Sequence, residues 1–120
     1  LWEIPMKNTT RIGLKAEQLA AEYLISNGYK VIERNFRNRY CEIDIIALQK
    51  EFVCLVEVKY RKNDLQGGGL EAINHDKKRR LRNAFEYWLF QNEQYQHLQP
   101  RIDVVAVDAQ RRIELIKDAI

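Results

Sequence analysis

Residues that commonly build metal cages from sulfur and nitrogen are scarce in this sequence. The 120 residues include two cysteines and two histidines, and Cys41 and Cys54 show neither a CxxC spacing nor a neighbouring histidine cluster. This spacing argues against a structural zinc site, which uses closely spaced Cys and His ligands. Two unpaired cysteines within apolar runs are typical of a cytosolic protein, so we expect a cytoplasmic location.

Long apolar runs are absent as well. No stretch approaches the roughly 20 apolar residues that a membrane helix needs, which argues against a membrane partner. The segment Leu1 to Pro5 lacks the charged and apolar regions of a signal peptide, and Met6 could be a natural start. We expect residues 1–10 to form an N-terminal extension. We expect residues 11–120 to form a single domain, because they contain no repeat, low-complexity tract or Pro/Ser-rich linker.

The composition is that of a globular domain with a mild preference for anionic partners. Hydrophobic residues make up 46% of the chain and charged residues 31%, which suffices for a core and a polar surface. The net charge is +3, so the positions of the charges carry more information than their sum.

Apolar periodicity predicts two helices and five strands. A first helix is expected from Thr10, capped by Thr9 or Thr10 and ended by Asn27-Gly28. Strands are expected over 29–34, 41–48, 52–60, 102–107 and 112–117, the last as an edge strand. A second amphipathic helix, with Asn74 as its cap, is marked by Ile73, Leu81, Ala84, Phe85, Trp88 and Leu89. The order α-β-β-β-α-β-β predicts an α/β fold with a mixed central sheet flanked by helices.

Two expected central strands carry charged residues where a core should be apolar. Glu57 and Lys59 alternate onto one face of their strand, and Glu42 and Asp44 share a face of theirs. If the turn between the strands is two residues long, Gln49 pairs with Phe52. Counting back in that register places Asp44 opposite Glu57, and Glu42 opposite Lys59, at Cβ separations of about 4.5–5.5 Å.

This register predicts a metal site. Asp44 and Glu57 would be like charges side by side, which is destabilising unless a cation neutralises them. Oxygen ligands suit Mg²⁺, which takes one or two carboxylates and keeps waters for a phosphate. Lys59 would then lie where it could stabilise developing phosphate charge. The alternative is an ordinary cross-strand ion pair at a wet sheet edge, contributing about 0–1 kcal/mol.

Basic residues concentrate in two segments. One precedes the acidic strand and holds Arg34, Arg37 and Arg39 beside Phe36 and Tyr40. The other opens the second helix and contains Lys77, Lys78, Arg79, Arg80 and Arg82. Both could hold a sugar-phosphate backbone, and a solvated helix face is the alternative for the second.

Two further acids are expected to have ordinary roles. Asp103, beside Arg101 in a core strand, is expected to be structural. Glu17, taken alone, is expected to be an ordinary solvated glutamate.

Short segments along the chain, in a specific order and spacing, carry a family resemblance: Gly13, Glu17-Gln18-Leu19-Ala20, Gly28-Tyr29, Arg34-Asn35-Phe36-Arg37, Glu42-Ile43-Asp44-Ile45-Ile46-Ala47, Val56-Glu57-Val58-Lys59-Tyr60-Arg61, Glu71-Ala72-Ile73, Lys77 and Asp103-Val104-Val105. They resemble the YraN-like family, small bacterial proteins described as predicted endonucleases. That family belongs to the restriction-endonuclease-like superfamily and looks related to archaeal Holliday junction resolvases. The resemblance runs from about Arg11 to the C-terminus. Cys41 and Ala16 stand where the family often has Gly, and Ile43 where the superfamily motif expects Pro.

The resemblance implies a restriction-endonuclease-like core and a PD-(D/E)xK nuclease site. Asp44 corresponds to the motif aspartate, and Glu57 and Lys59 to its ExK half. Asp44 and Glu57 would hold Mg²⁺ or Mn²⁺, with the Val58 carbonyl as an added ligand. Glu17 corresponds to the acidic residue from the first helix, which would bind water or a second ion.

The same resemblance suggests how a DNA strand would be held. Lys77 matches a basic position that faces the phosphates, and Glu42 would support the site. Arg37, Arg39, Arg61 and Arg80 are the further candidates for positioning the nucleic acid.

Three interpretations remain open at this point. The first is a Mg²⁺- or Mn²⁺-dependent endonuclease acting on DNA, with branched or single-stranded DNA as candidate substrates. The second is a nucleic-acid-binding module that kept the fold and lost catalysis. The third is an assembly protein whose charged strands pair across a homodimer. A resolvase-like role would itself need two sites, and hence a homodimer.

Overall fold

The computed structural model describes residues 8–61 and 74–120, with side chains from Gly13 onward in the first segment. Its elements are α1 (Asn8–Ser26), β1 (Lys30–Arg37), β2 (Glu42–Gln49), β3 (Phe52–Arg61), α2 (His75–Gln91), the short 3-10 helix η2 (Glu93–Tyr95), β4 (Gln99–Asp108) and β5 (Ile113–Ile116). The predicted order is confirmed. Residues 8–10 of the expected extension already belong to α1, and Ile73 lies outside the described residues.

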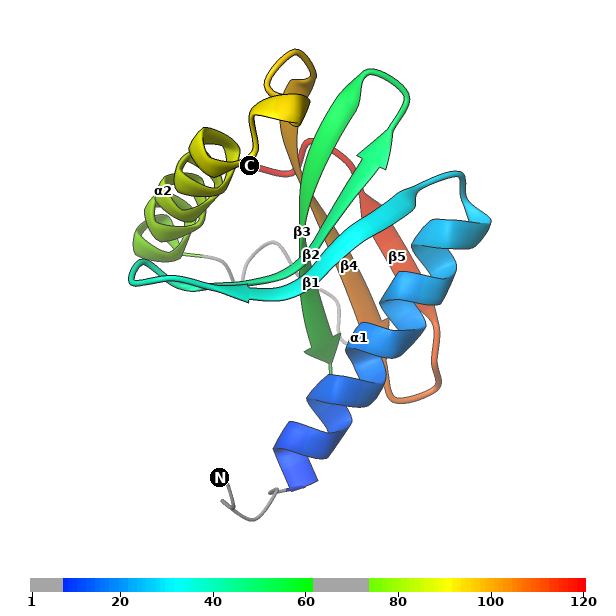
Figure 1. Cartoon of the computed structure of the whole chain (residues 1–120). Coiled ribbons are helices and arrows are strands. Elements are labelled where there is room, and N and C mark those ends of the chain that lie inside the picture. Colours follow the sequence, from blue (N-terminus) through cyan, green and yellow to red (C-terminus); the bar gives the residue numbers. More distant parts are fainter. Residues whose placement is uncertain (1–7, 62–73) are drawn as a thin grey trace.

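The strands form one five-stranded sheet in the order β1-β2-β3-β4-β5 (Figure 1). Neighbours pair antiparallel except β3 and β4, which are parallel. A parallel pair requires a crossover connection, and α2 lies in the segment that joins β3 to β4. The predicted mixed sheet is therefore confirmed, with β3 at its centre and β5 at one edge.

Two separate apolar clusters hold the helices against opposite faces of the sheet. Helix α1 contributes Ala16, Ala20, Ala21 and Leu24, at spacings of four, one and three residues, to the cluster that contains Cys54 and Val56. Helix α2 contributes Leu81, Ala84, Phe85 and Trp88 to the cluster that contains Val53 and Leu55. Because neighbouring β3 residues alternate between the clusters, both faces of this strand are buried.

Local sequence explains where most elements begin and end. Asn74 caps α2, since its side chain accepts a hydrogen bond from the Lys77 N–H, as predicted. Gly28, with φ +89°, follows the last turn of α1 in the left-handed conformation that glycine tolerates. The expected capping of α1 by Thr9 or Thr10 was wrong, because the helix begins at Asn8.

The strand bounds differ from the prediction mainly at β1 and β4, and β4 begins three residues earlier than expected, at Gln99. β1 runs on to Arg37, three residues past the expected end at Arg34, and Phe36 and Arg37 pair with β2. β5 is shorter than expected.

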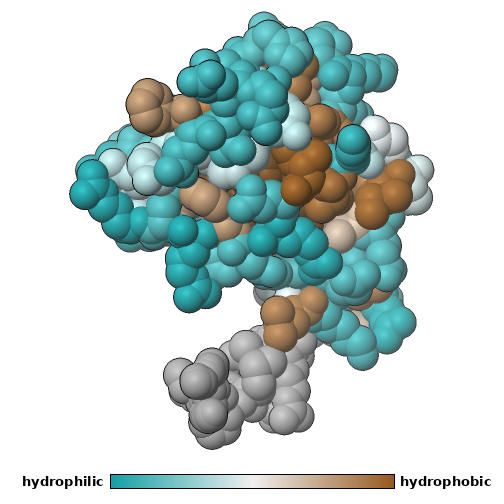
Figure 2. Space-filling model, in the orientation of Figure 1, coloured by the Kyte–Doolittle hydropathy of each residue, from teal (hydrophilic) through white to brown (hydrophobic). Residues whose placement is uncertain are grey.

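Among the described residues, no helix is long and apolar enough to cross a membrane. Figure 2, in the orientation of Figure 1, shows a largely hydrophilic surface, with the most hydrophobic residues gathered beside α1.

One buried charge is fully explained by the fold. Asp103 on β4 is 0% exposed. Its carboxylate accepts from Arg101 Nε (2.9 Å), from the Tyr29 hydroxyl (2.8 Å) and from the Asp118 N–H (2.8 Å). Arg101 also donates to Gln49 and lies over the Phe52 ring, 4.4 Å from its centroid. The sequence-based expectation of a structural aspartate paired with an arginine is confirmed.

Removing this carboxylate should strongly destabilise the fold. We expect Asp103→Ala to lower the free energy of unfolding by about 3–5 kcal/mol, because it leaves the Arg101 charge buried and uncompensated. Asp76→Ala is the matched control, since Asp76 forms exposed ion pairs with Arg79 and Arg80 that contribute about 0–1 kcal/mol. Urea unfolding monitored by circular dichroism would measure both changes. Equal, small effects would contradict this account.

Candidate functional site

β2 and β3 follow the predicted register near their connecting turn but stop pairing before they reach Asp44 and Glu57. Gln49 pairs with Phe52, as expected, and the pairing continues to Ile45 and Val56. Beyond that point β2 stays paired with β1, down to Arg37 and Glu42. β3 stays paired with β4, out to Arg61 and Asp108. The sheet therefore divides into two halves between β2 and β3, which diverge visibly in Figure 1.

Asp44 lies at this fork. Its Oδ2 accepts a hydrogen bond of 2.9 Å from the N–H of Val58. A side chain thus occupies the place where the next backbone hydrogen bond of a regular ladder would lie. The expected backbone pairing of Asp44 with Glu57 is absent from the observed register, and the carboxylate bonds to the residue that follows Glu57 instead.

The fork also changes which way β2 faces. Ile45 and Ala47 pack in the α1 cluster, whereas Ile43 packs in the α2 cluster. Residues two apart in a regular strand share a face, so β2 turns over between Ile43 and Ile45. Asp44 lies where β2 turns over, so its charge interacts with Glu17 of α1 and with Lys77 of α2.

On the α2 side, Glu57 is held between two lysines. Its Oε2 lies 3.6 Å from Lys77 Nζ at the start of α2 and 3.9 Å from Lys59 Nζ on its own strand. Glu57 is only 4% exposed, and its buried Oε1 has no hydrogen-bond partner among the described residues. A buried carboxylate oxygen normally has a partner, so Glu57 retains an unused site for a ligand atom.

On the α1 side, the Asn35 amide links Glu17 to Glu42. The Asn35 amide, oriented by these partners, donates to Glu17 Oε1 (3.0 Å) and to Glu42 Oε2 (3.2 Å). Asn35 has φ 57°, the left-handed region that Asn tolerates better than most residues, and this places an amide between two acids. Glu42 also pairs with Arg37 Nη2 (3.4 Å), so its predicted pairing with Lys59 was wrong.

The crowded carboxylates hold protons more tightly than usual. Burial raises the pKa of Asp44 to about 7; the charge of Glu57 adds to this rise and the Val58 N–H opposes it. Burial likewise raises the pKa of Glu17 to about 7, with the charges of Asp44 and Glu42 adding to the rise. A hydrogen bond between the Glu17 and Asp44 carboxyls contributes as well. Both shifts have the direction that burial and neighbouring negative charges produce.

The donor atoms fit a hard divalent cation with few protein ligands. Within residues 8–61 and 74–120, no group of three His, Cys, Asp or Glu side chains is close enough to form a closed metal cage. Mg²⁺ typically uses one or two carboxylates and keeps several waters, so a closed cage is not needed. Asp44 and the unpartnered Oε1 of Glu57 provide such a pair.

The structure places the predicted nucleic-acid contacts at different distances from this cluster. Lys77 contacts Glu57 directly, and Arg37 contacts Glu42. Arg80 pairs with Asp76 on the surface of α2, and Arg39 lies over the Tyr40 ring, 5.4 Å from its centroid. Arg61 is at the end of β3, opposite Asp108. Asn35 was missed by sequence reasoning, because no spacing rule indicates a contact among three separate elements.

Comparisons with known proteins agree in one family. The family described as "Uncharacterised protein family UPF0102" matches residues 16–107. A UPF0102 protein of Carboxydothermus hydrogenoformans is 39% identical over 101 residues, covering 84% of this chain and 85% of the relative. A UPF0102 protein of Syntrophus aciditrophicus is 41% identical over 117 residues, covering 95% and 91%. One from Lachnoclostridium phytofermentans is 42% identical over 107 residues, covering 89% and 90%.

The carboxyl pKa values predict an unusual pH dependence of stability. The folded, metal-free protein keeps protons that the unfolded chain releases near pH 4, so this contribution to stability is lost as pH rises through about 7. We expect Asp44→Asn to be more stable than the wild type near pH 8 in EDTA, by on the order of 1 kcal/mol, or about 4–8 °C in Tm. The difference should shrink towards pH 5.

Thermal unfolding across this pH range would measure the difference, with exposed Asp76→Asn as the control that should show none of it. Adding Mg²⁺ or Mn²⁺ near pH 8 should raise the Tm of the wild type and leave Asp44→Asn unchanged. A destabilised Asp44→Asn near pH 8 would show that the carboxylate is a structural group like Asp103.

Proposed function

The chain belongs to the UPF0102 family, the YraN-like family, and from this premise and the forked acidic site we propose that it is a metal-dependent endonuclease that hydrolyses DNA phosphodiester bonds. The observation that carries the proposal is the meeting of Asp44, Glu57 and Lys59 at the fork of β2 and β3, with one buried oxygen of Glu57 unpartnered. The proposed place of action is the cytoplasm.

Asp44 and Glu57 are the proposed ligands of Mg²⁺ or Mn²⁺, with the Val58 carbonyl as a further ligand. When bound, the ion would lower the pKa of a water and polarise the phosphate. The Asp44 carboxylate is fixed by the Val58 N–H, so its free oxygen keeps one orientation. Fixing the ligands before substrate arrives avoids reorganisation during the reaction.

Lys59 is the proposed electrostatic catalyst. Its ammonium group lies 3.9 Å from Glu57 Oε2 and belongs to the same strand face, so its charge is held beside the proposed metal ligand. A cation fixed there would stabilise the negative charge that develops on the phosphoryl oxygens. Lys77, 3.6 Å from the same oxygen, would hold a neighbouring phosphate.

Glu17 is the proposed proton acceptor. A general base works best when its pKa lies near the working pH, and burial raises the pKa of Glu17 to about 7. Its carboxylate accepts a hydrogen bond from the Asn35 amide and lies close enough to Asp44 for the two charges to interact. Glu17 would therefore take the proton of the attacking water.

The contrast between two buried acids favours catalysis over a purely structural or binding role. Asp103 has an arginine, a hydroxyl and a backbone N–H as partners. Glu57 is about as buried, yet has an unpartnered oxygen and an acidic neighbour. Leaving such a group in the interior is costly, which is typical of residues kept for function rather than for stability.

The proposed substrate is DNA because cations surround the acids. Lys77, Arg37, Arg39, Arg61 and Arg80 would contact the phosphates, whose recognition by Lys and Arg is independent of sequence. Cleavage of both strands of a branched molecule would need two sites, so a homodimer is part of the proposal for such substrates.

A nicking assay tests the proposal directly. Purified protein is incubated with branched, single-stranded and duplex DNA in Mg²⁺, in Mn²⁺ and in EDTA. We expect metal-dependent cleavage that falls by about 10²–10³-fold in Lys59→Ala, because one preorganised charge at the reacting phosphate contributes that much. Lys50→Ala, at the exposed β2–β3 turn, is the matched lysine control and should cleave normally.

Two outcomes would reject the assignment. Cleavage as fast with Lys59→Ala as with the wild type would identify a contaminating nuclease. Salt-sensitive DNA binding without any cleavage, and unchanged by Asp44→Asn, would instead favour a non-catalytic nucleic-acid-binding module on the same fold.

A further inference from the structure

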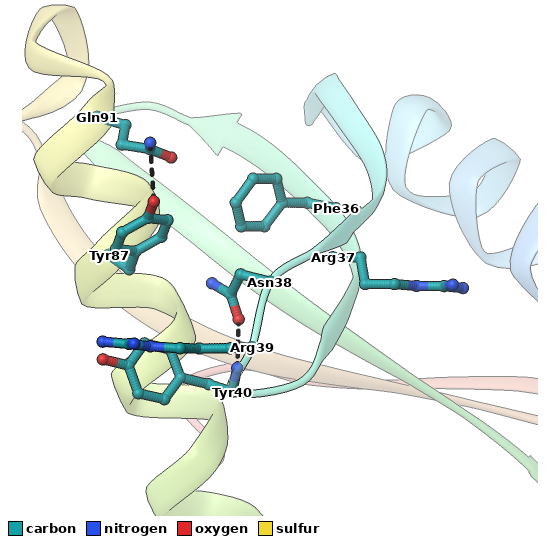
Figure 3. A pocket seen from close by; sticks show the side chains of 7 residues that line it. All are labelled: Phe36, Arg37, Asn38, Arg39, Tyr40, Tyr87 and Gln91. Atoms are coloured by element: carbon teal, nitrogen blue, oxygen red, sulfur yellow. Dashed lines mark hydrogen bonds between the residues drawn. The ribbon is translucent and has the colours of Figure 1, made fainter.

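A hollow lies between the β1–β2 connection and α2. It is a pocket of about 520 Å³. One wall is formed by the consecutive residues Phe36 to Tyr40, and the other by Tyr87 and Gln91 of α2 (Figure 3). Pockets that take small organic ligands have volumes of about 300–1,000 Å³. The hollow is therefore large enough for a planar ring system.

Three aromatic residues, Phe36, Tyr40 and Tyr87, belong to the lining. Tyr40 and Tyr87 approach edge to face, with ring centroids 6.4 Å apart at 61°. Tyr87 is 42% exposed, so its ring is only partly covered by neighbouring side chains. Figure 3 shows Phe36 opposite Tyr87, on the other side of the pocket. A flat ligand between them would have ring surface on two sides.

The polar groups of the pocket include unused hydrogen-bonding capacity. Asn38 Oδ1 accepts from the N–H groups of Tyr40 (2.8 Å) and Cys41 (3.2 Å), which fixes the amide. Its buried Nδ2 has no hydrogen-bond partner in the part of the chain that the structure describes, and it points towards the α2 wall in Figure 3. Gln91 donates to the Tyr87 hydroxyl (3.1 Å), so its amide is also oriented at the rim. A donor fixed beside aromatic rings is suited to the polar edge of a base.

The charges of the pocket are cationic. Its lining contains two arginines and no acid. Arg39 lies over the Tyr40 ring, 5.4 Å from its centroid. The Arg37 side chain extends away from the pocket in Figure 3 and pairs with Glu42, which shares Asn35 with Glu17. One short stretch of chain thus joins the aromatic pocket to the acidic cluster.

We infer that this pocket holds an unpaired base of the nucleic-acid strand and gives the protein a preference for single-stranded or branched DNA over duplex. The inference rests on the proposed function for the identity of the ligand as DNA. Stacking needs a base that is free of its partner strand, because paired bases expose only their edges. The phosphates on either side would then lie near Arg39 and Arg37, the latter next to the acidic cluster.

Binding measured without metal tests this inference separately from cleavage. Fluorescence anisotropy in EDTA would compare a labelled single strand with its duplex. We expect Tyr87→Ala to weaken single-strand binding by about 5- to 150-fold, which corresponds to about 1–3 kcal/mol for one stacked base, and to change duplex binding by less than about twofold. Tyr87→Phe keeps the ring and should bind as the wild type does.

A backbone without bases provides the second measurement. A strand made of abasic residues should bind the wild type and Tyr87→Ala equally weakly, because it has no base that could stack on Tyr87. Alanine at an exposed helix position favours the helix, so Tyr87→Ala should fold, and its circular dichroism spectrum would check this.

The possible results separate the two proposals. Unchanged single-strand binding by Tyr87→Ala, equal losses for single strand and duplex, or no single-strand binding by the wild type would each overturn the base pocket. Cleavage that depends on Lys59 would still support the nuclease in the first two cases. The expected binding pattern without any cleavage would support the pocket and reject the nuclease.

Discussion

The hydrogen bond from the Val58 N–H to the Asp44 carboxylate is the constraint on which the candidate site depends. It closes the β2–β3 ladder with a side chain where backbone pairing stops, so the two halves of the sheet can part without leaving that N–H unsatisfied. The opening admits Glu17 from α1 on one side and Lys77 from α2 on the other. A continuous five-stranded ladder would keep the two helices apart, and their charged side chains could not meet at one place.

Two neighbouring strands carry buried acids whose surroundings differ. β4 carries Asp103, whose partners satisfy its charge and tie Tyr29 and Asp118 to the sheet. β3 carries Glu57, whose charge is only partly compensated by two lysines and whose second oxygen is unused. The two acids come from adjacent parallel strands and are similarly buried, so burial alone does not distinguish them. The two acids differ in how many carboxylate oxygens have hydrogen-bond partners, and this difference is the better indication of a candidate ligand site.

The sequence predicted the fold well because its signals are local. Apolar periodicity located both helices, and the two-residue turn after Gln49 set the β2–β3 register. The site was only partly predictable, because the alternation rule assumes a regular ladder. It correctly joined Glu57 with Lys59, but it also placed Glu42 near Lys59, although Glu42 follows β1 away from the fork and pairs with Arg37. The positions of Asn35 and Tyr87 depend on a left-handed residue and on helix packing, which pairwise spacing does not encode.

The small residues of α1 have a consequence that reaches beyond packing. Ala16, Ala20 and Ala21 are almost completely buried against the sheet, and methyl groups set how closely the helix axis can approach it. Glu17 follows directly after Ala16, so the depth of its carboxylate is fixed by apolar volume on the neighbouring face of the same helix. Members of the family could therefore adjust the reach of this acid by one or two carbon atoms at the alanine positions, without altering any charged residue.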